Sequence, residues 1–229
     1  LLADQARDLK QAGLRRLNVS LDTVRPASFR KLTRRDALGR VIDGIDAAQE
    51  AGFEQIRINS VAMRGFTEDE IEPLVLFCRT RKLTLRFIEF MPFDGEQLWD
   101  TGQVLPESAI RARIERAFGP LEPLERHDRS QPATDYRLED GTVIGLIASV
   151  TQPFCGHCNR LRLTADGTVR NCLFSREQWD VRELLRSEAP LSALQEQIVR
   201  CIGAKKAGHG TDAPEPLGHS DRAMYQIGG

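Results

Sequence analysis

Residues 1–91 repeat a helix followed by a strand three times, and this alternation limits the possible folds more than any other feature of the sequence. In each repeat, apolar residues at helical spacing give way to a short run of β-branched and aliphatic residues. The expected helices cover residues 1–13, 40–52 and 67–82, and the expected strands cover residues 16–21, 56–63 and 83–91. Strands joined by helices pair in parallel through right-handed crossovers. The pattern therefore predicts an α/β fold with functional residues at the carboxyl ends of its strands.

Local signals mark the ends of these helices. Gly13 and Gly52 follow the first two, as glycine does where a helix ends in a left-handed residue. Thr67 and Glu70 have the spacing of a capping box, in which each side chain accepts a hydrogen bond from the backbone of the first turn. We therefore expect the third helix to begin at Thr67.

The pattern changes beyond Pro92. One helix and two hairpins are expected, the second hairpin turning at Asp166-Gly167, a usual tight-turn pair. Two helices follow, and then a tail of low order over residues 207–226. The expected elements are a helix at 106–118, hairpins at 136–147 and 160–171, and helices at 181–186 and 191–206.

Three of the five cysteines gather in one segment. Cys155 and Cys158 form a CxxC pair, and Cys172 returns after 13 intervening residues. Three thiolates suit a 4Fe-4S cluster with one iron left open, because a single tetrahedral ion normally takes four protein ligands. With His157 or His127 as a fourth ligand, the same cysteines could instead form a structural Cys3His zinc site.

Two arginines lie between the second and third of these cysteines. Arg160 and Arg162 alternate as strand residues do, so both guanidinium groups are expected on one face beside the thiolates. Forked donors of this kind bind carboxylates and phosphates. The competing interpretation is that both are exposed strand residues paired with Asp or Glu.

Composition excludes several classes of protein. The net charge is −1, which does not indicate a nucleic-acid partner, and no apolar run approaches the roughly 20 residues that cross a bilayer. Cysteines clustered in this way fit a reducing compartment, and we expect a cytoplasmic protein. Cys78 and Cys201 lie in apolar helical patterns and are expected to be buried bystanders.

The cysteine segment also carries a resemblance. The run C-x-x-C-N-R-x-R-L-T-A-D-G followed by C-L-F resembles the carboxyl-terminal motif of the GTP 3',8-cyclases, the MoaA family of radical S-adenosylmethionine enzymes in molybdenum cofactor biosynthesis. Further matches are NVSLD at 18–22, IRINSVAMRG at 56–65, RFIEFMPF at 86–93 and the final Gly228-Gly229. The resemblance implies the second half of an incomplete (β/α)6 TIM-like barrel over residues 1–95. A carboxyl-terminal α+β region over 96–229 would carry an iron-sulfur cluster.

The resemblance also implies roles for individual residues. Cys155, Cys158 and Cys172 would hold a 4Fe-4S cluster whose open iron binds the guanine of GTP. The remaining site residues would be Arg57, Arg160, Leu161 and Arg162 for GTP, Ser20 and Met91 for S-adenosylmethionine, and Gly228 and Gly229 as a tail that reaches the substrate. Arg57 stands where the family usually has lysine, so the charge is kept but the head group is larger and planar.

The implied reaction is that of a lyase. A 5'-deoxyadenosyl radical takes hydrogen from C3' of GTP, the ribose radical attacks guanine C8, and the product is 3',8-cyclo-7,8-dihydro-GTP. Cyclic pyranopterin monophosphate synthase would receive this product, and the family commonly forms dimers.

One departure from the family is large. The amino-terminal C-x-x-x-C-x-x-C that holds a second 4Fe-4S cluster and cleaves S-adenosylmethionine has no counterpart here. We therefore interpret the chain as a fragment that is inactive alone. Two alternatives stay open: another radical enzyme with an auxiliary cluster, or a noncatalytic binding module stabilised by zinc.

Overall fold

The computed structural model describes residues 1–95, 99–126, 128–206, 220 and 222–227. The chain forms two compact units. Unit 1 comprises Leu1–Phe90, Gly102–His127 and Pro132–Thr151, and unit 2 comprises Met91–Thr101, Asp128–Gln131 and Gln152–Gly229. Each unit combines segments from both sides of residue 95, so the division at that residue stays a prediction.

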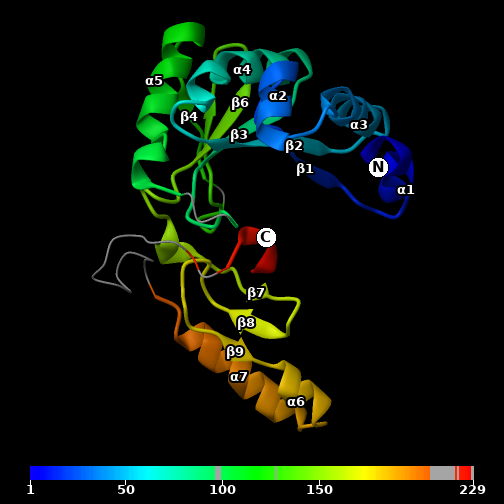
Figure 1. Ribbon diagram of the computed structural model, residues 1–229, viewed down its shortest axis with the longest axis vertical. Coiled ribbons are helices and arrows are strands. Elements are labelled where there is room, and N and C mark those ends of the chain that lie inside the picture. Colours follow the sequence, from blue (N-terminus) through cyan, green and yellow to red (C-terminus); the bar gives the residue numbers. More distant parts are fainter. Residues whose placement is uncertain (96–98, 127, 207–219, 221, 228–229) are drawn as a thin grey trace. The chain divides into compact units, whose positions relative to one another are not determined.

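Unit 1 is built on a sheet of six strands in the order β1-β2-β3-β6-β5-β4 (Figure 1). The first four strands in this order are mutually parallel, and β5 and β4 run antiparallel at one edge. The strands are β1 (Arg16–Ser20), β2 (Gln55–Ala62), β3 (Thr84–Glu89), β4 (Glu122–Pro123), β5 (Thr134–Arg137) and β6 (Val143–Ile147). The helices are α1 (Leu2–Gln11), α2 (Pro26–Thr33), α3 (Leu38–Glu50), α4 (Ile71–Thr80) and α5 (Glu107–Phe118). The three predicted helix and strand pairs, and their parallel order, are confirmed.

Two features of unit 1 were not predicted. Strand β6 belongs to the predicted hairpin, yet its second edge pairs in parallel with β3, so that Leu85 lies opposite Ile144. Helix α2 begins at Pro26, a residue that favours the first helical position because its φ is already helical. That proline was the available sequence signal for α2.

The predicted capping box at Thr67 is wrong. Residues Thr67–Asp69 form the short 3-10 helix η1, and α4 begins at Ile71. The Thr67 hydroxyl accepts from the backbone N–H of Met63 and donates to the carbonyl of Val61, so it secures the end of β2. The buried carboxylate of Glu70 accepts from the hydroxyl of Thr23 at 2.7 Å. Both side chains thus serve contacts with β2 and with the segment after β1.

The two faces of the sheet differ in polarity. Along β2, buried and half-buried residues alternate, which is the pattern of a strand with one face against the core. Ile58 and Leu85 on the buried face pack with Ile45 of α3 and Leu74 of α4. The opposite face carries the polar residues Arg57, Asn59 and Arg86. One face is therefore given to the hydrophobic core, and the other is available for polar ligands.

Gly145 in β6 allows a close approach on this polar face. A Cβ there would lie 2.7 Å from Oδ1 of Asp135, 2.9 Å from Cγ of Arg86 and 3.3 Å from Cβ of Ala133. The Arg86 and Asp135 side chains form an ion pair of 3.8 Å in this space. Glycine at this position therefore makes room for the pair.

We expect Gly145→Ala to lower the free energy of unfolding by about 1–3 kcal/mol, because overpacking a filled space forces neighbours to move. Gly39→Ala in α3 is the control, since nothing beyond its own helix backbone lies within 4 Å of the methyl group that alanine would add. This control should be neutral or stabilise by up to about 1 kcal/mol. Urea denaturation followed by circular dichroism measures both, and equal effects would contradict the proposed crowding.

Unit 2 contains the cysteine segment. Its sheet has the order β7-β8-β9, formed by β7 (Arg162–Leu163), β8 (Thr168–Arg170) and β9 (Trp179–Asp180). Helices α6 (Arg182–Arg186) and α7 (Leu191–Gly203) follow as predicted. The predicted second hairpin is confirmed, with Gly167 at φ +83° in its turn. A small core forms around Val169, Val181 and Cys201.

The predicted low-order tail is wrong at its end. Met224–Gln226 forms a 3-10 turn, and the Gln226 side chain accepts from the backbone N–H of Ala223. Residues 207–219 and 221 lie outside the described part of the chain. Among the helices of the described residues, none has the length and apolar character needed to span a membrane.

Candidate functional site

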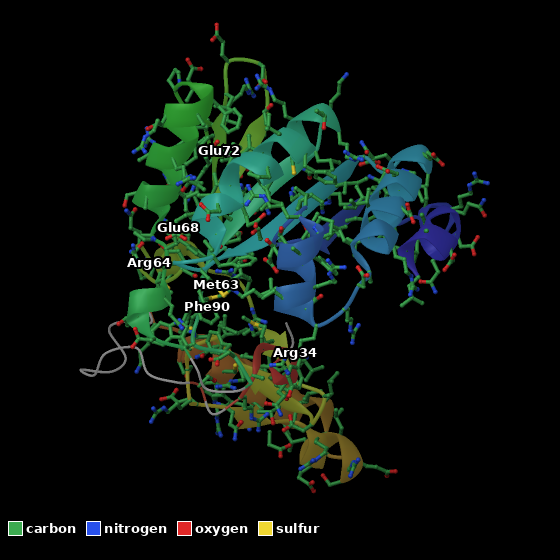
Figure 2. The ribbon with its side chains drawn as sticks, turned by 45° about the horizontal axis from the view of Figure 1, so that its top comes forward. Arg34, Met63, Arg64, Glu68, Glu72 and Phe90 are labelled. Carbon is green, nitrogen blue, oxygen red and sulfur yellow. The ribbon has the colours of Figure 1, made fainter. Side chains whose placement is uncertain are left out.

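The carboxyl ends of the parallel strands carry the residues expected to bind S-adenosylmethionine. Ser20 is the exposed last residue of β1, and it lies opposite Asn59 of β2. Met63, Arg64 and Phe90 lie at this same end of the sheet (Figure 2). Met91, the second expected residue, directly follows Phe90 in the sequence and is half-buried. Ser20 belongs to unit 1 and Met91 to unit 2.

A cationic group lies on the polar face of the sheet. Arg57 is half-buried, and its pKa is lowered first by burial and then by the charges of Arg86 and Arg16. The Nε atoms of Arg57 and Arg86 and Oδ1 of Asn59 are buried without a hydrogen-bond partner among the described residues. Such atoms are costly unless a ligand or water satisfies them.

Sequence reasoning identified Arg57 but missed Arg86. The missed signal was register, because Arg57 lies opposite Thr84 and Asn59 lies opposite Arg86. Residues two positions apart along a strand lie on the same face of the sheet. Arg57 is therefore a diagonal neighbour of Arg86 on the adjacent strand. Both arginines lie near the carboxylate of Asp135, which forms an ion pair with Arg86, and their Nε atoms are left to donate to a further acceptor.

The NVSLD run ends in a part-buried contact between the segment after β1 and strand β2. Oδ1 of Asp22 accepts from the backbone N–H of Val61 at 2.7 Å. Burial raises the pKa of Asp22, and the bond from Val61 acts in the opposite direction. The contact holds the carboxyl ends of the two strands in register beside Ser20.

Glu89, at the end of β3, joins three segments of unit 1. Its side chain is 1% exposed. Oε2 accepts from the backbone N–H groups of Val150 and Thr151, each at 2.8 Å. Oε1 accepts from the Thr151 hydroxyl and from the backbone N–H of Glu107 at 3.1 Å. The carboxylate therefore fixes the ends of β3 and β6 and the start of α5.

The carboxylate of Glu89 lies beside two points at which the chain leaves unit 1. Phe90 and Thr151 are the residues at which the chain leaves unit 1 after β3 and after β6. Met91 follows the first exit, and Cys155 lies four residues beyond the second. Glu89 thus fixes the backbone at the points where both segments begin.

We expect Glu89→Ala to lower the free energy of unfolding by about 3 kcal/mol or more, because three part-buried backbone donors lose their charged acceptor. Thr151→Val is the matched control: it removes one side-chain donor and should cost about 1 kcal/mol. Chemical denaturation of both variants tests this. A Glu89→Ala effect no larger than that of Thr151→Val would contradict the assigned role.

In unit 2, the CxxC pair lies on a single turn. Cys155–His157 form a 3-10 helix, and the backbone N–H of Cys158 donates to the carbonyl of Cys155 at 3.0 Å. Both cysteines and Cys172 are partly exposed, and His157 is exposed. Cys78 and Cys201 are buried, as predicted. Burial raises the pKa of Cys78 to about 12 and also raises the pKa of Cys201, so both stay protonated thiols.

Arg160 contacts the sulfur of Cys158. Its Nε and Nη2 atoms lie 3.3 and 3.2 Å from Sγ, and its guanidinium group lies 4.9 Å from the centroid of the Phe154 ring. Burial alone would raise the pKa of Cys158. Hydrogen bonds from Arg160 and the charges of Arg160 and Lys205 outweigh burial, so the pKa is lowered. The site favours a thiolate, the form that binds metals.

Arg162 is the second arginine of the segment. The observed strand β7 begins at Arg162, so the predicted strand pairing of Arg160 is wrong, although both arginines do lie near the thiolates. Burial and Arg160 lower the pKa of Arg162, while Cys172 and Cys158 act in the opposite direction. Nη1 of Arg162 also donates to the carbonyl of Ile227 at 3.5 Å. Leu161 between them is exposed, and Gly228 and Gly229 lie outside the described residues.

Lys205, just beyond α7, was missed by sequence reasoning. Its ammonium donates to the carbonyl of Arg160 at 2.8 Å and to that of Asn171. These carbonyls flank the segments that carry Cys158 and Cys172. No motif signals such a contact, because it joins residues 34 or more positions apart.

The donor set fits an anionic cluster. Arg160 donates to the sulfur of Cys158, and hydrogen bonds to sulfur are among the features with which proteins tune iron-sulfur clusters. Among the described residues, no group of three or more His, Cys, Asp or Glu side chains is arranged so that it could hold a metal ion. The thiolates of a cubane bind separate irons and therefore need not converge on one point. His127, one fourth ligand of the zinc alternative, lies outside the described residues.

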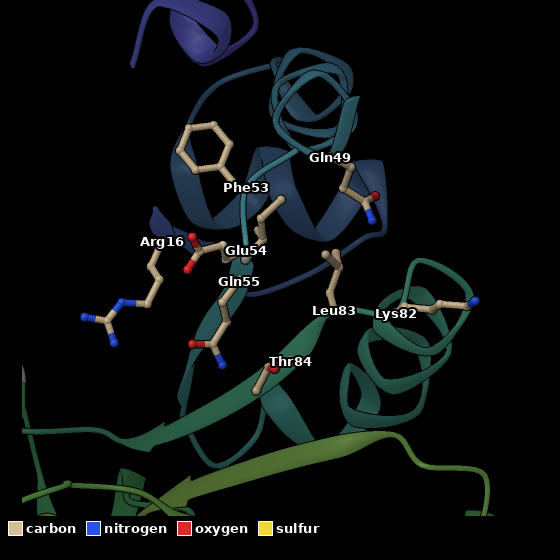
Figure 3. Close-up of a pocket in the computed structure, with 9 residues that line it drawn as sticks. Arg16, Gln49, Phe53, Glu54, Gln55, Lys82, Leu83 and Thr84 are labelled. Carbon is tan, nitrogen blue, oxygen red and sulfur yellow. The ribbon is translucent and has the colours of Figure 1, made fainter. Parts of the chain in front are cut away.

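A pocket of about 490 Å³ lies at the opposite ends of the strands (Figure 3). It is lined by residues around the starts of β2 and β3, including Phe53, Gln55, Lys82 and Thr84. Ligands of parallel α/β folds bind at the carboxyl ends of the strands. This pocket is therefore not part of the candidate site.

Comparisons with known proteins bear on this site. The family described as "Molybdenum Cofactor Synthesis C" matches residues 83–211, which include the cysteine segment. The chain belongs to this family. The family described as "Radical SAM superfamily" matches residues 1–78, which include β1 and β2. The parallel sheet with its covering helices fits the partial TIM-like fold implied by the resemblance.

The chain is also similar to curated proteins named GTP 3',8-cyclase. The protein of Rhodopirellula baltica is 49% identical over 233 residues, covering 100% of this chain and 64% of that protein. A Mycobacterium protein is 44% identical over 229 residues, covering 100% and 65%. A Corynebacterium glutamicum protein is 43% identical over 227 residues, covering 96% and 60%. The resemblance found from the motifs is confirmed, and the chain spans less than two thirds of the length of these relatives.

Proposed function

We propose that the complete protein is a GTP 3',8-cyclase, which converts GTP to 3',8-cyclo-7,8-dihydro-GTP in the first step of molybdenum cofactor biosynthesis. The observation that carries the proposal is the cationic cysteine segment, in which Arg160 donates to Cys158 and Arg162 lies in the field of Cys158 and Cys172. Similarity to proteins of that name over the whole chain supports it.

Cys155, Cys158 and Cys172 would hold a 4Fe-4S cluster in unit 2. When bound, this cluster supplies an open iron that binds the guanine ring. A further cluster with S-adenosylmethionine supplies the radical in the complete protein. This chain's own residues bind and orient the ligands, and they exclude water from a reactive intermediate.

Arg160, Leu161 and Arg162 would contact GTP beside the cluster, where the positive charges offset the triphosphate. Arg57 would contact a phosphate or the ribose, and the unpartnered Nε of Arg86 on the same face supports an anion there. Ser20 and Met91 would bind S-adenosylmethionine through a hydroxyl and a thioether.

The terminal Gly228 and Gly229 would act at the substrate. The bond from Arg162 to the carbonyl of Ile227 supports this assignment, because it fixes the residue before the glycines next to a proposed GTP contact. Two glycines form a slim end that fits a narrow channel.

The sheet of unit 1 would be the second half of a (β/α)6 barrel. Strand β1 is an edge strand with an alternating pattern of exposure, so further parallel strands can add to it. We propose a cytoplasmic enzyme that passes its product to cyclic pyranopterin monophosphate synthase and forms a homodimer.

Metal content tests the cluster. Anaerobic reconstitution of the chain should give about four irons and four sulfides per chain. Cys158→Ser should lose this iron, and Cys78→Ala, a cysteine outside the segment, should keep it. Iron and sulfide assays with absorption spectra measure the outcome. A colourless chain saturated by one zinc ion would reject the cluster and favour the binding module.

GTP binding tests the arginines. Arg162→Ala should keep the iron and weaken GTP binding by about 10- to 100-fold, since a charge-assisted hydrogen bond contributes about 1.5–3 kcal/mol. Arg186→Ala removes an exposed arginine of α6 and should leave the Kd unchanged. Isothermal titration under anaerobic conditions measures both. Equal affinities for the two variants would refute the role of Arg162.

A further inference from the structure

Arg170, in β8, carries a buried charge that the proposed roles do not use. It is 2% exposed and lies opposite Arg162 of β7. Its Nη2 donates to the carbonyl of Ser175. Its Nε and Nη1 atoms are buried and have no hydrogen-bond partner among the described residues. Only part of the guanidinium fork is therefore satisfied by the residues that the structure describes.

An unpaired guanidinium group is expensive to bury. Removing an ion from water costs several kcal/mol unless an opposite charge and hydrogen bonds compensate it. Arg170 forms no ion pair with a described carboxylate. The residue opposite it in the sheet, Arg162, is another cation, and the charge of Arg170 contributes to lowering the pKa of Arg162. The surroundings of Arg170 therefore require an anion.

The cysteine segment identifies this anion. Cys172 follows Arg170 by two residues, and Arg162, which lies opposite Arg170 in the sheet, lies two residues beyond Arg160, which contacts the sulfur of Cys158. A 4Fe-4S cluster held by three thiolates carries a net negative charge, and its sulfur atoms accept hydrogen bonds. Such a cluster supplies both the charge and the acceptors that the Nε and Nη1 atoms lack.

We propose that Arg170 donates hydrogen bonds to sulfur atoms of the cluster bound by Cys155, Cys158 and Cys172, and so stabilises its reduced state. The inference rests on the cluster of the proposed function. Reduction adds negative charge to the cluster, and a buried cation beside it favours that added charge. Arg170 therefore raises the reduction potential of the cluster and slows the loss of iron.

Stability measurements give a test in which one substitution should have opposite effects: it should stabilise the metal-free chain and destabilise the cluster-loaded chain. In the metal-free chain, Arg170→Met should raise the unfolding midpoint, because an uncompensated buried charge is replaced by an apolar side chain of similar length. In the cluster-loaded chain, the same variant should lose iron to a chelator about 10- to 100-fold faster than the unmodified chain. Arg176→Met removes an exposed arginine that follows Cys172 in the sequence, and it should change neither the unfolding midpoint nor the rate of iron loss.

Electrochemistry gives a second, independent readout. The reduction potential of the loaded Arg170→Met variant should shift to more negative values, and that of Arg176→Met should not. Arg170→Lys keeps the charge but lacks the fork, so its potential should lie between those of the unmodified chain and Arg170→Met. This variant also serves if Arg170→Met does not fold.

The outcomes separate this inference from the proposed function. If the unmodified chain binds no iron-sulfur cluster, the proposed function fails before any variant is compared, and the inference fails with it. If the chain binds the cluster but the potential and iron retention of both Arg170 variants match those of Arg176→Met, only the inference is overturned. A fall in the unfolding midpoint of metal-free Arg170→Met would also overturn it, because Arg170 would then be satisfied by the chain.

Discussion

The carboxylate of Glu89 is the contact on which the arrangement of unit 1 depends. Parallel strands end at one edge of a sheet, but nothing in the sheet itself fixes the direction in which the chain leaves them. Glu89 accepts from backbone donors after β6 and at the start of α5, so one side chain sets several exits. Met91 and the cysteine segment follow two of these exits in the sequence, so the contact fixes the backbone from which both segments start.

The periodicity of apolar residues and the spacing of motif residues predicted much of the fold but less of the candidate site. The helix and strand alternation gave the order of β1, β2 and β3, because each element carries its own apolar pattern. The pairing of β6 with β3 was missed, since a local pattern identifies a strand but not its second neighbour. The prediction at Thr67 failed for a different reason: its hydroxyl bonds the backbone of Met63 and Val61, four and six residues earlier, and this local contact replaces the capping bond.

In the candidate site, too, some residues could be found from the sequence and others could not. Cys155, Cys158 and Cys172 were visible as a motif because their spacing is local. Lys205 and Arg170 were not visible. The first acts through backbone carbonyls far away in sequence, and the second is distinguished only by its burial and its unpartnered nitrogens. A hydrophilic residue gives no sign in the sequence that the fold will remove it from water.

Guanidinium nitrogens without a hydrogen-bond partner among the described residues occur in both units. Those of Arg113 and Arg182 lie 3.5 Å from the carboxylates of Glu72 and Glu183, whereas the arginines of the candidate site call for another explanation. Arg57 and Arg86 in unit 1 and Arg170 in unit 2 each keep a buried Nε without a partner among the described residues. A protein that folded only for stability would replace such groups or pair them, because each one costs free energy. A protein that binds anions gains from leaving them open, since a donor already fixed in place binds its ligand without reorganising. Such a cost in the unliganded chain is what we expect if the proposed substrate and the proposed cluster, both negatively charged, bind beside these arginines.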